Sequence, residues 1–187
     1  MPHTLSHMLA IGGTGMLADA VCWLAEQGHE VTVVGRNQHK LQRLTDRHPS
    51  LHPVTADYKE LERFVSVLKE AVVQRGYFTR VLAWIHDREE TIFKRLYTEL
   101  FSDPSCHWEL FHVLGSASNL EEIEKKVNPP PNCKYHQIKL GFALEGNHSR
   151  WLTHKEISAG AIDAMKTGRE VTIVGTLTPW SKRPTYG

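Results

Sequence analysis

The chain has 187 residues, of which 41% are apolar and 23% charged, and its formal net charge is +1. This length and composition are typical of one globular domain and exclude the disordered and fibrous classes. A net charge so close to zero supplies no global attraction to nucleic acid or to an anionic membrane. We therefore expect a small-molecule ligand, and neither nucleic acid nor membrane as a partner.

The cysteines and the N-terminal residues indicate the compartment. Cys22, Cys106 and Cys133 are odd in number and widely spaced, unlike the short paired spacings of zinc sites and disulfide frameworks. Met1 to His7 lacks the basic and apolar segments of a secretory signal, and no apolar run approaches the roughly 18 residues of a membrane span. The twelve histidines are scattered without a metal-binding motif. We expect a cytoplasmic protein with free thiols and no metal.

Short apolar or β-branched runs alternate with segments of helical periodicity along the chain. Seven strands are predicted, over residues 8–11, 30–34, 52–56, 80–86, 108–115, 135–142 and 169–177. Helices are predicted between them, over residues 17–26, 38–46, 58–75, 89–101 and 119–127, with a last helix that Thr153 opens through a capping box with Glu156. Parallel neighbours need crossover connections, which helices supply. The pattern predicts an α/β fold in which residues 1–187 form one domain: a doubly wound parallel sheet of about seven strands in a three-layer α/β/α Rossmann arrangement, with residues 178–187 as a tail.

A glycine-rich turn joins the first predicted strand to the first predicted helix. It reads Gly-Gly-Thr-Gly-Met-Leu-Ala from Gly12 to Ala18. A diphosphate approaches the backbone only where side chains are absent, and the free amides and positive end of the following helix attract it. The strand and helix that flank the turn favour a dinucleotide site over an ordinary structural turn. The predicted cofactor-binding residues are Gly12, Gly13, Thr14, Gly15, Met16 and Leu17.

The residues after the second strand bear on which dinucleotide binds. An acidic residue there would accept a hydrogen bond from the ribose 2′-hydroxyl of NAD, whereas this chain has Arg36 and Asn37. A guanidinium pairs bidentately with a 2′-phosphate. The sequence thus predicts NADP(H) in preference to NAD(H), with Asn37 as a helper. The alternative is that Arg36 is a solvated loop charge.

These residues resemble the short-chain dehydrogenase/reductase superfamily, in particular its extended or atypical members with a Gly-x-x-Gly-x-x-Gly/Ala turn. Asp57, after the third strand, matches the family position that contacts adenine. Ser116, in Gly-Ser-Ala-Ser after the fifth strand, resembles the family's serine-bearing strand end. The resemblance spans roughly the whole chain and implies that ligands bind at the carboxyl ends of the strands. It also implies a homo-oligomer.

Two departures from the family pattern concern the reaction. After the fourth strand the chain reads Ala-Trp-Ile-His-Asp from Ala83 to Asp87, where the family carries an Asn-Asn-Ala-Gly-like sequence. The one good match to the family's catalytic Tyr-x-x-x-Lys is Tyr135 with Lys139, but it lies in a predicted strand. There the two side chains would stand roughly 13 Å apart, against about 6 Å on a helix.

Candidates for the chemistry are therefore the strand-end residues His86 and Ser116. A histidine titrates near neutral pH and can protonate a carbonyl oxygen, while a serine hydroxyl can orient that oxygen. The alternatives are that His86 bonds a neighbouring carbonyl and that Ser116 caps a helix.

The predicted loop from Gly146 to Thr153 lies where this fold places substrate. Arg150 and Trp151 can supply a cation and a flat wall for an anionic or aromatic substrate, and Phe142 can cover the nicotinamide. Alternatively, Trp151 packs under the last helix while Arg150 is solvated.

Two functions of different kinds remain open at this point. One is an NADP(H)-dependent reductase of a small carbonyl or imine with a non-standard active site, and the other is a catalytically silent NAD(P)(H)-binding sensor or regulatory protein. Fold-level analogy favours the enzyme. A weaker hypothesis is that Lys182 and Arg183, beside Trp180, contact another subunit or an acidic partner.

Overall fold

The structure is a computed structural model that describes residues 6–185. Residues 1–5 of the segment expected to lack a secretory signal, and residues 186 and 187 of the expected tail, lie outside the described residues. Seven parallel strands form one sheet in the order β3-β2-β1-β4-β5-β6-β9. These strands are β1 (His7–Ile11), β2 (Glu30–Gly35), β3 (Leu51–Thr55), β4 (Phe78–Ala83), β5 (Trp108–Leu114), β6 (Cys133–Leu140) and β9 (Val171–Val174). The predicted doubly wound parallel sheet is confirmed.

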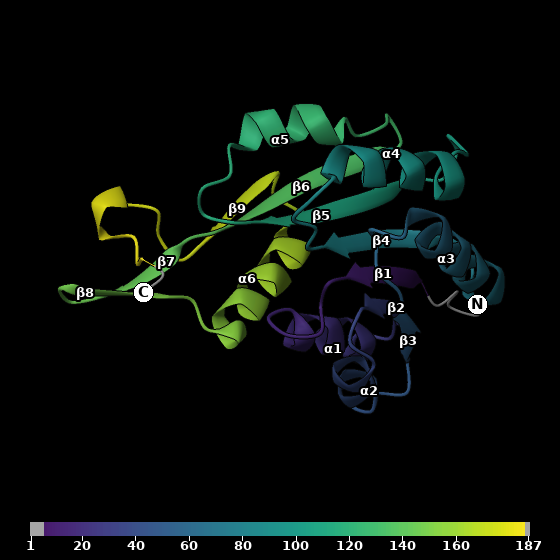
Figure 1. Cartoon of the computed structure of the whole chain (residues 1–187), viewed down its shortest axis with the longest axis horizontal. Coiled ribbons are helices and arrows are strands. Elements are labelled where there is room, and N and C mark those ends of the chain that lie inside the picture. Colours follow the sequence, from purple (N-terminus) through teal and green to yellow (C-terminus); the bar gives the residue numbers. More distant parts are fainter. Residues whose placement is uncertain (1–5, 186–187) are drawn as a thin grey trace.

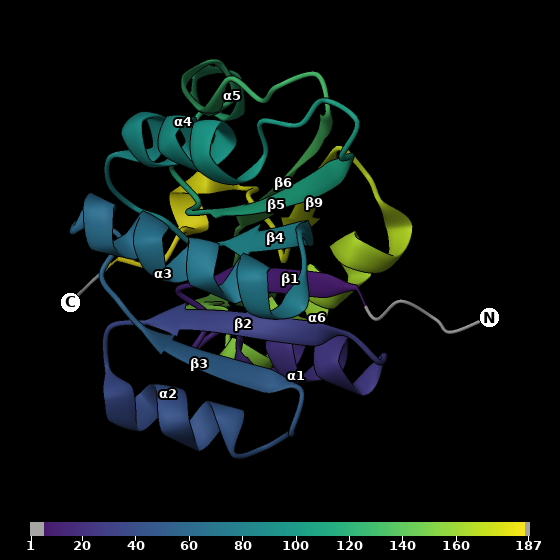
Figure 2. The ribbon, with the colours of Figure 1, turned by 90° about the vertical axis from the view of Figure 1, so that its right-hand side faces the viewer.

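Six α-helices complete the three layers within this range. They are α1 (Ala18–Glu26), α2 (Gln38–Thr45), α3 (Leu61–Arg75), α4 (Glu89–Leu100), α5 (Leu120–Val127) and α6 (His154–Thr167). Helices α3, α4 and α5 cover one face of the sheet, and α1, α2 and α6 cover the other (Figures 1 and 2). None of the helices within residues 6–185 combines the length and apolar character needed to span a membrane.

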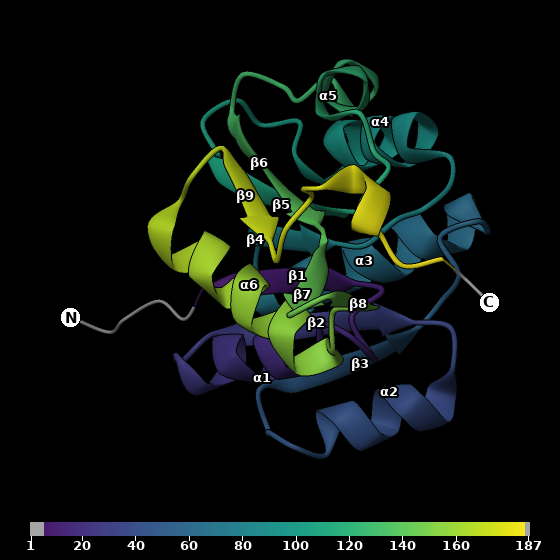
Figure 3. The same ribbon diagram turned by 90° about the vertical axis from the view of Figure 1, so that its left-hand side faces the viewer.

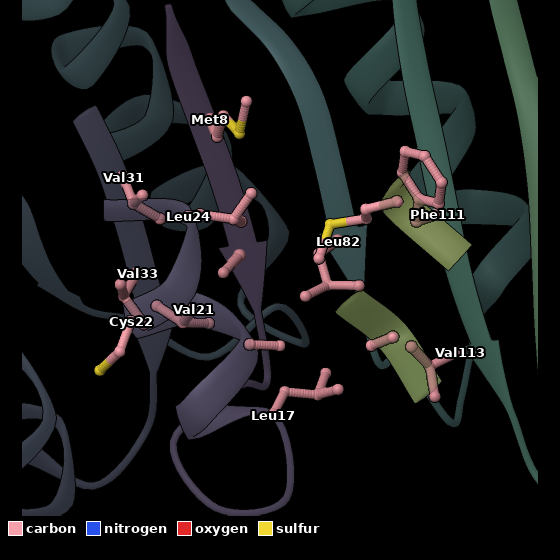
Figure 4. Close-up of a cluster of buried hydrophobic side chains, with 14 of the residues drawn as sticks. Met8, Leu17, Val21, Cys22, Leu24, Val31, Val33, Leu82, Phe111 and Val113 are labelled. Atoms are coloured by element: carbon pink, nitrogen blue, oxygen red, sulfur yellow. The ribbon is translucent and has the colours of Figure 1, made fainter. Parts of the chain in front are cut away.

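The central strands are apolar on both faces because both faces are covered. In β1, Met8 and Ala10 point into the core under α1, α2 and α6, whereas Leu9 and Ile11 point into the core under α3 and α4. Figure 4 shows part of the first core, where side chains of α1 meet those of β1, β2, β4 and β5. Burial of one large aliphatic side chain stabilises the fold by about 1.5–3 kcal/mol.

The strand order reverses between β1 and β4, which are neighbours in the sheet but are separated by β2 and β3 in the chain. The chain leaves β1 toward one side of the sheet and leaves β4 toward the other, so their carboxyl ends border a crevice. The glycine turn from Gly12 begins at this crevice. The topology thus places the predicted cofactor site at the position where open α/β sheets bind ligands.

Two segments differ from the sequence-based prediction. The fourth strand ends at Ala83 instead of residue 86, so His86 lies in the loop that follows it. The predicted loop after the sixth strand contains an antiparallel hairpin of β7 (Phe142–Glu145) and β8 (His148–Trp151). Gly146, with a positive φ of 60°, provides the tight turn between them. Four-residue strands joined by a two-residue turn give little periodic signal in a sequence.

The described part of the predicted tail is folded against the rest of the protein. After β9, the chain pairs Thr176 with Phe142 and then forms a short 3₁₀ helix, η1 (Trp180–Lys182). Figure 3 shows this C-terminal segment beside the β7–β8 hairpin. The described part of the C-terminal segment therefore returns to the carboxyl edge of the sheet.

Candidate functional site

The turn after β1 can be formed only with glycine at its first position. Gly12 has a positive φ of 78°, a conformation that costs an L-residue with a side chain about 1–2 kcal/mol. A Cβ there would also lie 2.7 Å from the carbonyl oxygen of Trp84. The turn therefore lies directly against the chain that leaves β4, with its backbone uncovered by side chains at this point.

The apex of the turn has unpaired backbone donors. Residues 6–185 offer no backbone acceptor to the amides of Thr14 and Met16, and α1 begins directly after the turn, at Ala18. The Ser158 hydroxyl, from α6, donates to the carbonyl oxygen of Met16 over 2.7 Å. The turn is thereby fixed from behind while its amides stay available to an acceptor such as a diphosphate.

A pocket of about 590 Å³ opens beside this turn. Its walls come from the turn itself, from the end of β2, from α2, and from the residues that follow β3 and β4. The polar side chains that line it are those of Thr14, Arg36, Asn37, Lys40, Tyr58 and His86. The structure therefore brings Gly12 and Thr14 of the turn together with Arg36 and Asn37 in one cavity. The other predicted residues of the turn do not line it: Gly13, Gly15, Met16 and Leu17.

The cationic end of the pocket includes a residue that the sequence analysis missed. Lys40, in the first turn of α2, lines the pocket together with Arg36. Asn37 is the N-cap of α2, because its side-chain oxygen accepts a hydrogen bond of 3.0 Å from the amide of Lys40. Residues 36 and 40 are one helical turn apart around the start of a predicted helix, and this spacing is the signal that could have revealed Lys40.

Asp57, predicted to contact adenine, follows β3 at the edge of this region. Its neighbours Ala56 and Tyr58 line the pocket. The Asp57 carboxylate itself accepts a hydrogen bond of 2.9 Å from the amide of Lys59, so it organises the start of the following loop. The adenine contact stays a prediction.

His86 lies on the Arg36 side of the carboxyl edge. It lines the same pocket, and its ring meets that of Trp84 edge to face with centroids 3.9 Å apart. Partial burial lowers the pKa of His86, the nearby charge of Arg36 lowers it further, and Glu89 opposes the shift. The neutral imidazole is therefore favoured at pH 7. Ser116 is not among the residues that line this pocket.

Ser116 is buried at the end of β5, with 7% of its surface exposed. Its hydroxyl oxygen accepts a hydrogen bond of 3.1 Å from Nε of Arg183, which lies in the C-terminal segment. The structure thus separates the two predicted catalytic residues. His86 belongs to the pocket beside the glycine turn, and Ser116 belongs to a group of residues farther along the edge.

Phe142, predicted to cover the nicotinamide, and Arg150 and Trp151, predicted to bind substrate, lie on the hairpin. Phe142 is fully buried and pairs across the hairpin with Trp151. Arg150 binds two carboxylates of its own chain, with contacts of 2.7 Å to Glu145 and 2.7 Å to Glu156. A substrate anion would therefore compete with both for Arg150. Trp151 lies beside Arg183, whose guanidinium carbon is 5.4 Å from its ring centroid.

Tyr135 and Lys139 lie on β6, as the strand prediction required. The Tyr135 hydroxyl is within 2.9 Å of Nδ1 of His112 and accepts a hydrogen bond from Gln137. Burial raises the pKa of Tyr135, which opposes any role as an acid near neutral pH. The extended strand thus separates this pair, as the expected spacing of roughly 13 Å implies.

The thiols of Cys22, Cys106 and Cys133 are free. Within residues 6–185, no group of three or more His, Cys, Asp or Glu side chains is arranged to hold a metal ion.

The strand order, the glycine turn at the switch point and the adjoining pocket define a Rossmann fold with a pocket at the crevice where such sheets bind ligands. Solved structures of short-chain dehydrogenases and reductases share this fold. A glucose dehydrogenase of Caenorhabditis elegans aligns with a TM-score of 0.69 at 12% identity, over 95% of this chain and 99% of that one. A short-chain dehydrogenase/reductase of Burkholderia phymatum, solved in complex with NAD, aligns with a TM-score of 0.68 at 8% identity, over 91% and 90%.

A short-chain dehydrogenase of Streptomyces avermitilis aligns with a TM-score of 0.65 at 14% identity, over 94% of this chain and 89% of that one. No protein-family profile and no curated protein matches the sequence. The likeness to short-chain dehydrogenases is therefore one of fold: the chain has their three-layer Rossmann architecture with a very different sequence.

Proposed function

We propose that this protein is an NADP(H)-dependent oxidoreductase of the short-chain dehydrogenase type that acts on a small carbonyl or imine substrate. The observation that carries the proposal is the glycine turn against Trp84, with its free amides and a pocket that contains Arg36 and Lys40. The nucleotide-binding fold shared with short-chain dehydrogenases supports it.

The residues of the turn and of the pocket have the chemical groups that would bind the diphosphate and the 2′-phosphate of NADP(H). The amides of Thr14 and Met16 would hold the diphosphate, because they lack backbone acceptors within residues 6–185. Arg36 and Lys40 would hold the 2′-phosphate, since both cations line one pocket with no carboxylate among its lining residues. The bound cofactor supplies hydride to the substrate.

The proposed active site centres on Ser116. Its oxygen accepts a hydrogen bond from Arg183, so its own hydroxyl hydrogen remains to donate to a substrate carbonyl oxygen. His86, which lines the neighbouring pocket beside the glycine turn, is the proposed proton donor. Because partial burial lowers the pKa of His86 from 6.5, reduction that depends on this residue should accelerate as the pH falls below 6.5.

The test is NADPH turnover against a panel of small carbonyls and imines, with wild type, His86→Ala and Ser116→Ala. We expect turnover by the wild type, a loss of about 10²-fold or more in each variant, and unchanged NADPH binding in Ser116→Ala. Turnover that both variants retain would remove these two residues from the reaction.

A catalytically silent NAD(P)(H)-binding sensor is the second candidate. It is favoured by the strand conformation of Tyr135 and Lys139, which leaves no helical Tyr-x-x-x-Lys pair at these positions. Tight NADPH binding without turnover of any panel member would support it over the enzyme. We further propose cytoplasmic residence and a homo-oligomer, which fractionation and light scattering of the purified protein test directly.

A further inference from the structure

The C-terminal segment after β9 is fixed to the carboxyl edge of the sheet. Phe142 and Thr176 exchange two backbone hydrogen bonds, of 2.9 and 2.8 Å. The contact is close enough that a Cβ at Gly141 would overlap the carbonyl oxygen of Thr176. The residues that follow, including η1, are thus held beside the strand ends (Figure 3).

Arg183 is the residue that this segment brings to the edge. Its guanidinium carbon lies 4.9 Å from the ring centroid of Trp180 and 5.4 Å from that of Trp151, distances at which an indole face attracts a cation. Its Nε donates to the Ser116 hydroxyl. Two aromatic rings and one hydrogen bond therefore fix the orientation of this side chain.

The charge of Arg183 has no counter-ion within residues 6–185. None of the ion pairs in this range includes it, and Ser116 is the single hydrogen-bond partner of its side chain there. Arg150, on the neighbouring hairpin, is different because two carboxylates already balance its charge. The two Nη groups of Arg183 therefore remain as donors in the planar arrangement that matches a carboxylate.

We propose that Arg183 binds a carboxylate of the substrate, and that the substrate is a small oxo acid whose carbonyl lies next to that carboxylate. This inference rests on the proposed function. The planar guanidinium holds the carboxylate, and the Ser116 hydroxyl donates to the adjacent carbonyl oxygen. Reduction consumes one hydride from NADPH and one proton, for which His86 is the proposed donor, breaks the carbonyl π bond, and yields the hydroxy acid and NADP⁺.

Binding without turnover gives the direct test. Oxamate is an oxo-acid mimic that accepts no hydride under these conditions, and its neutral counterpart oxamide lacks the carboxylate. Because Trp151 and Trp180 flank Arg183, intrinsic tryptophan fluorescence should report occupancy. We expect oxamate to bind wild type at least about tenfold more tightly than oxamide, the ratio expected for hydrogen bonds to a charged group. Inorganic phosphate serves as a second oxyanion and should bind more weakly than oxamate.

The matched variants are Arg183→Gln, Arg183→Lys and, as a control, Lys182→Gln, which removes an exposed charge from the same segment. The oxamate dissociation constant should rise about 10- to 100-fold in Arg183→Gln and should stay within about twofold of wild type in Lys182→Gln. Arg183→Lys keeps the charge without the planar donors and should fall between them.

Failure of this inference can be separated from failure of the proposed function, because NADPH binding is measured independently by calorimetry. A wild-type protein that binds NADPH but binds oxamate no better than oxamide contradicts the inference alone. Equal oxamate affinity in Arg183→Gln and Lys182→Gln also contradicts it. Absence of NADPH binding contradicts the proposed function, whatever oxamate does.

Discussion

The two halves of the carboxyl edge differ in what builds them. On the β1–β2 side, the glycine turn is one contiguous segment that offers backbone amides, and side chains from the ends of neighbouring strands complete the pocket beside it. On the β5–β6 side, Ser116, Trp151 and Arg183 come from three distant segments and meet only through side chains. The first half retains the features of a dinucleotide site, and the second departs from the pattern of short-chain dehydrogenases.

The difference between the two sides indicates which parts of a site on this fold can differ from one protein to another. A diphosphate is recognised by backbone amides and a helix end, so the turn permits few alternatives. Chemistry at the reacting carbon needs only suitable polar groups within reach, and different segments can supply them. The proposed cofactor site of the usual kind beside an unusual proposed reaction site is therefore physically consistent.

The largest effect is expected from a substitution at Gly12, in the glycine turn. In Gly12→Ala, the positive φ and the overlap with the Trp84 carbonyl oxygen together should lower the free energy of unfolding by about 3–5 kcal/mol, and NADPH affinity should fall at least 100-fold. The matched control for stability alone is Gly15→Ala, where the nearest atom to the new Cβ is 3.7 Å away, because Gly15 is itself a predicted cofactor-binding residue. Denaturant unfolding and calorimetry measure both quantities, and equal stability of the two variants would contradict the close packing at Gly12.

On the β5–β6 side, the pH dependence of the free energy of unfolding tests the environment of the buried His112. Burial lowers the pKa of His112 to about 4 from 6.5, so the neutral form is favoured in the fold. Its contribution is fully present above pH 6.5 and is lost as the pH falls toward 4, up to about 3 kcal/mol.

In His112→Gln, the free energy of unfolding should therefore fall less steeply between pH 6.5 and 4 than in wild type. His39→Gln is the control, because His39 is exposed on α2. Denaturant unfolding at several pH values measures these slopes. If wild type and His112→Gln had the same slope, the lowered pKa of His112 would be contradicted.

A smaller effect on nucleotide binding is expected from a substitution at Lys40, on the β1–β2 side. Lys40→Gln should raise the dissociation constant of NADPH by roughly tenfold, since one charge-assisted contact to the 2′-phosphate is lost, and should leave that of NADH unchanged. Arg43→Gln is the matched control on the same helix, because Arg43 does not line the pocket. An equal loss of affinity for NADPH and for NADH in Lys40→Gln would show that Lys40 does not contact the 2′-phosphate.

The sequence was informative wherever the structure depends on local pattern. Strand and helix alternation predicted the sheet, the capping box at Thr153 was confirmed, and the glycine turn lies where its spacing implied. Arg36 and Asn37 share the expected pocket. These features depend on residues that are neighbours in sequence or follow a fixed periodicity.

The contacts of Ser116 could not be predicted in the same way. Arg183 reaches Ser116 from 67 positions away, after an irregular segment that had the composition of a tail. Likewise, Ser158 supports the glycine turn from 142 positions away. Such pairings depend on tertiary packing, and a single sequence contains no periodic signal for them.

The most direct test of the account is calorimetric titration of the purified wild-type protein with NADPH and with NADH. The account predicts binding of NADPH with an affinity at least about tenfold higher than that of NADH, because two cations line the pocket expected to hold the 2′-phosphate. Absence of binding heat with either nucleotide at millimolar concentration would contradict it.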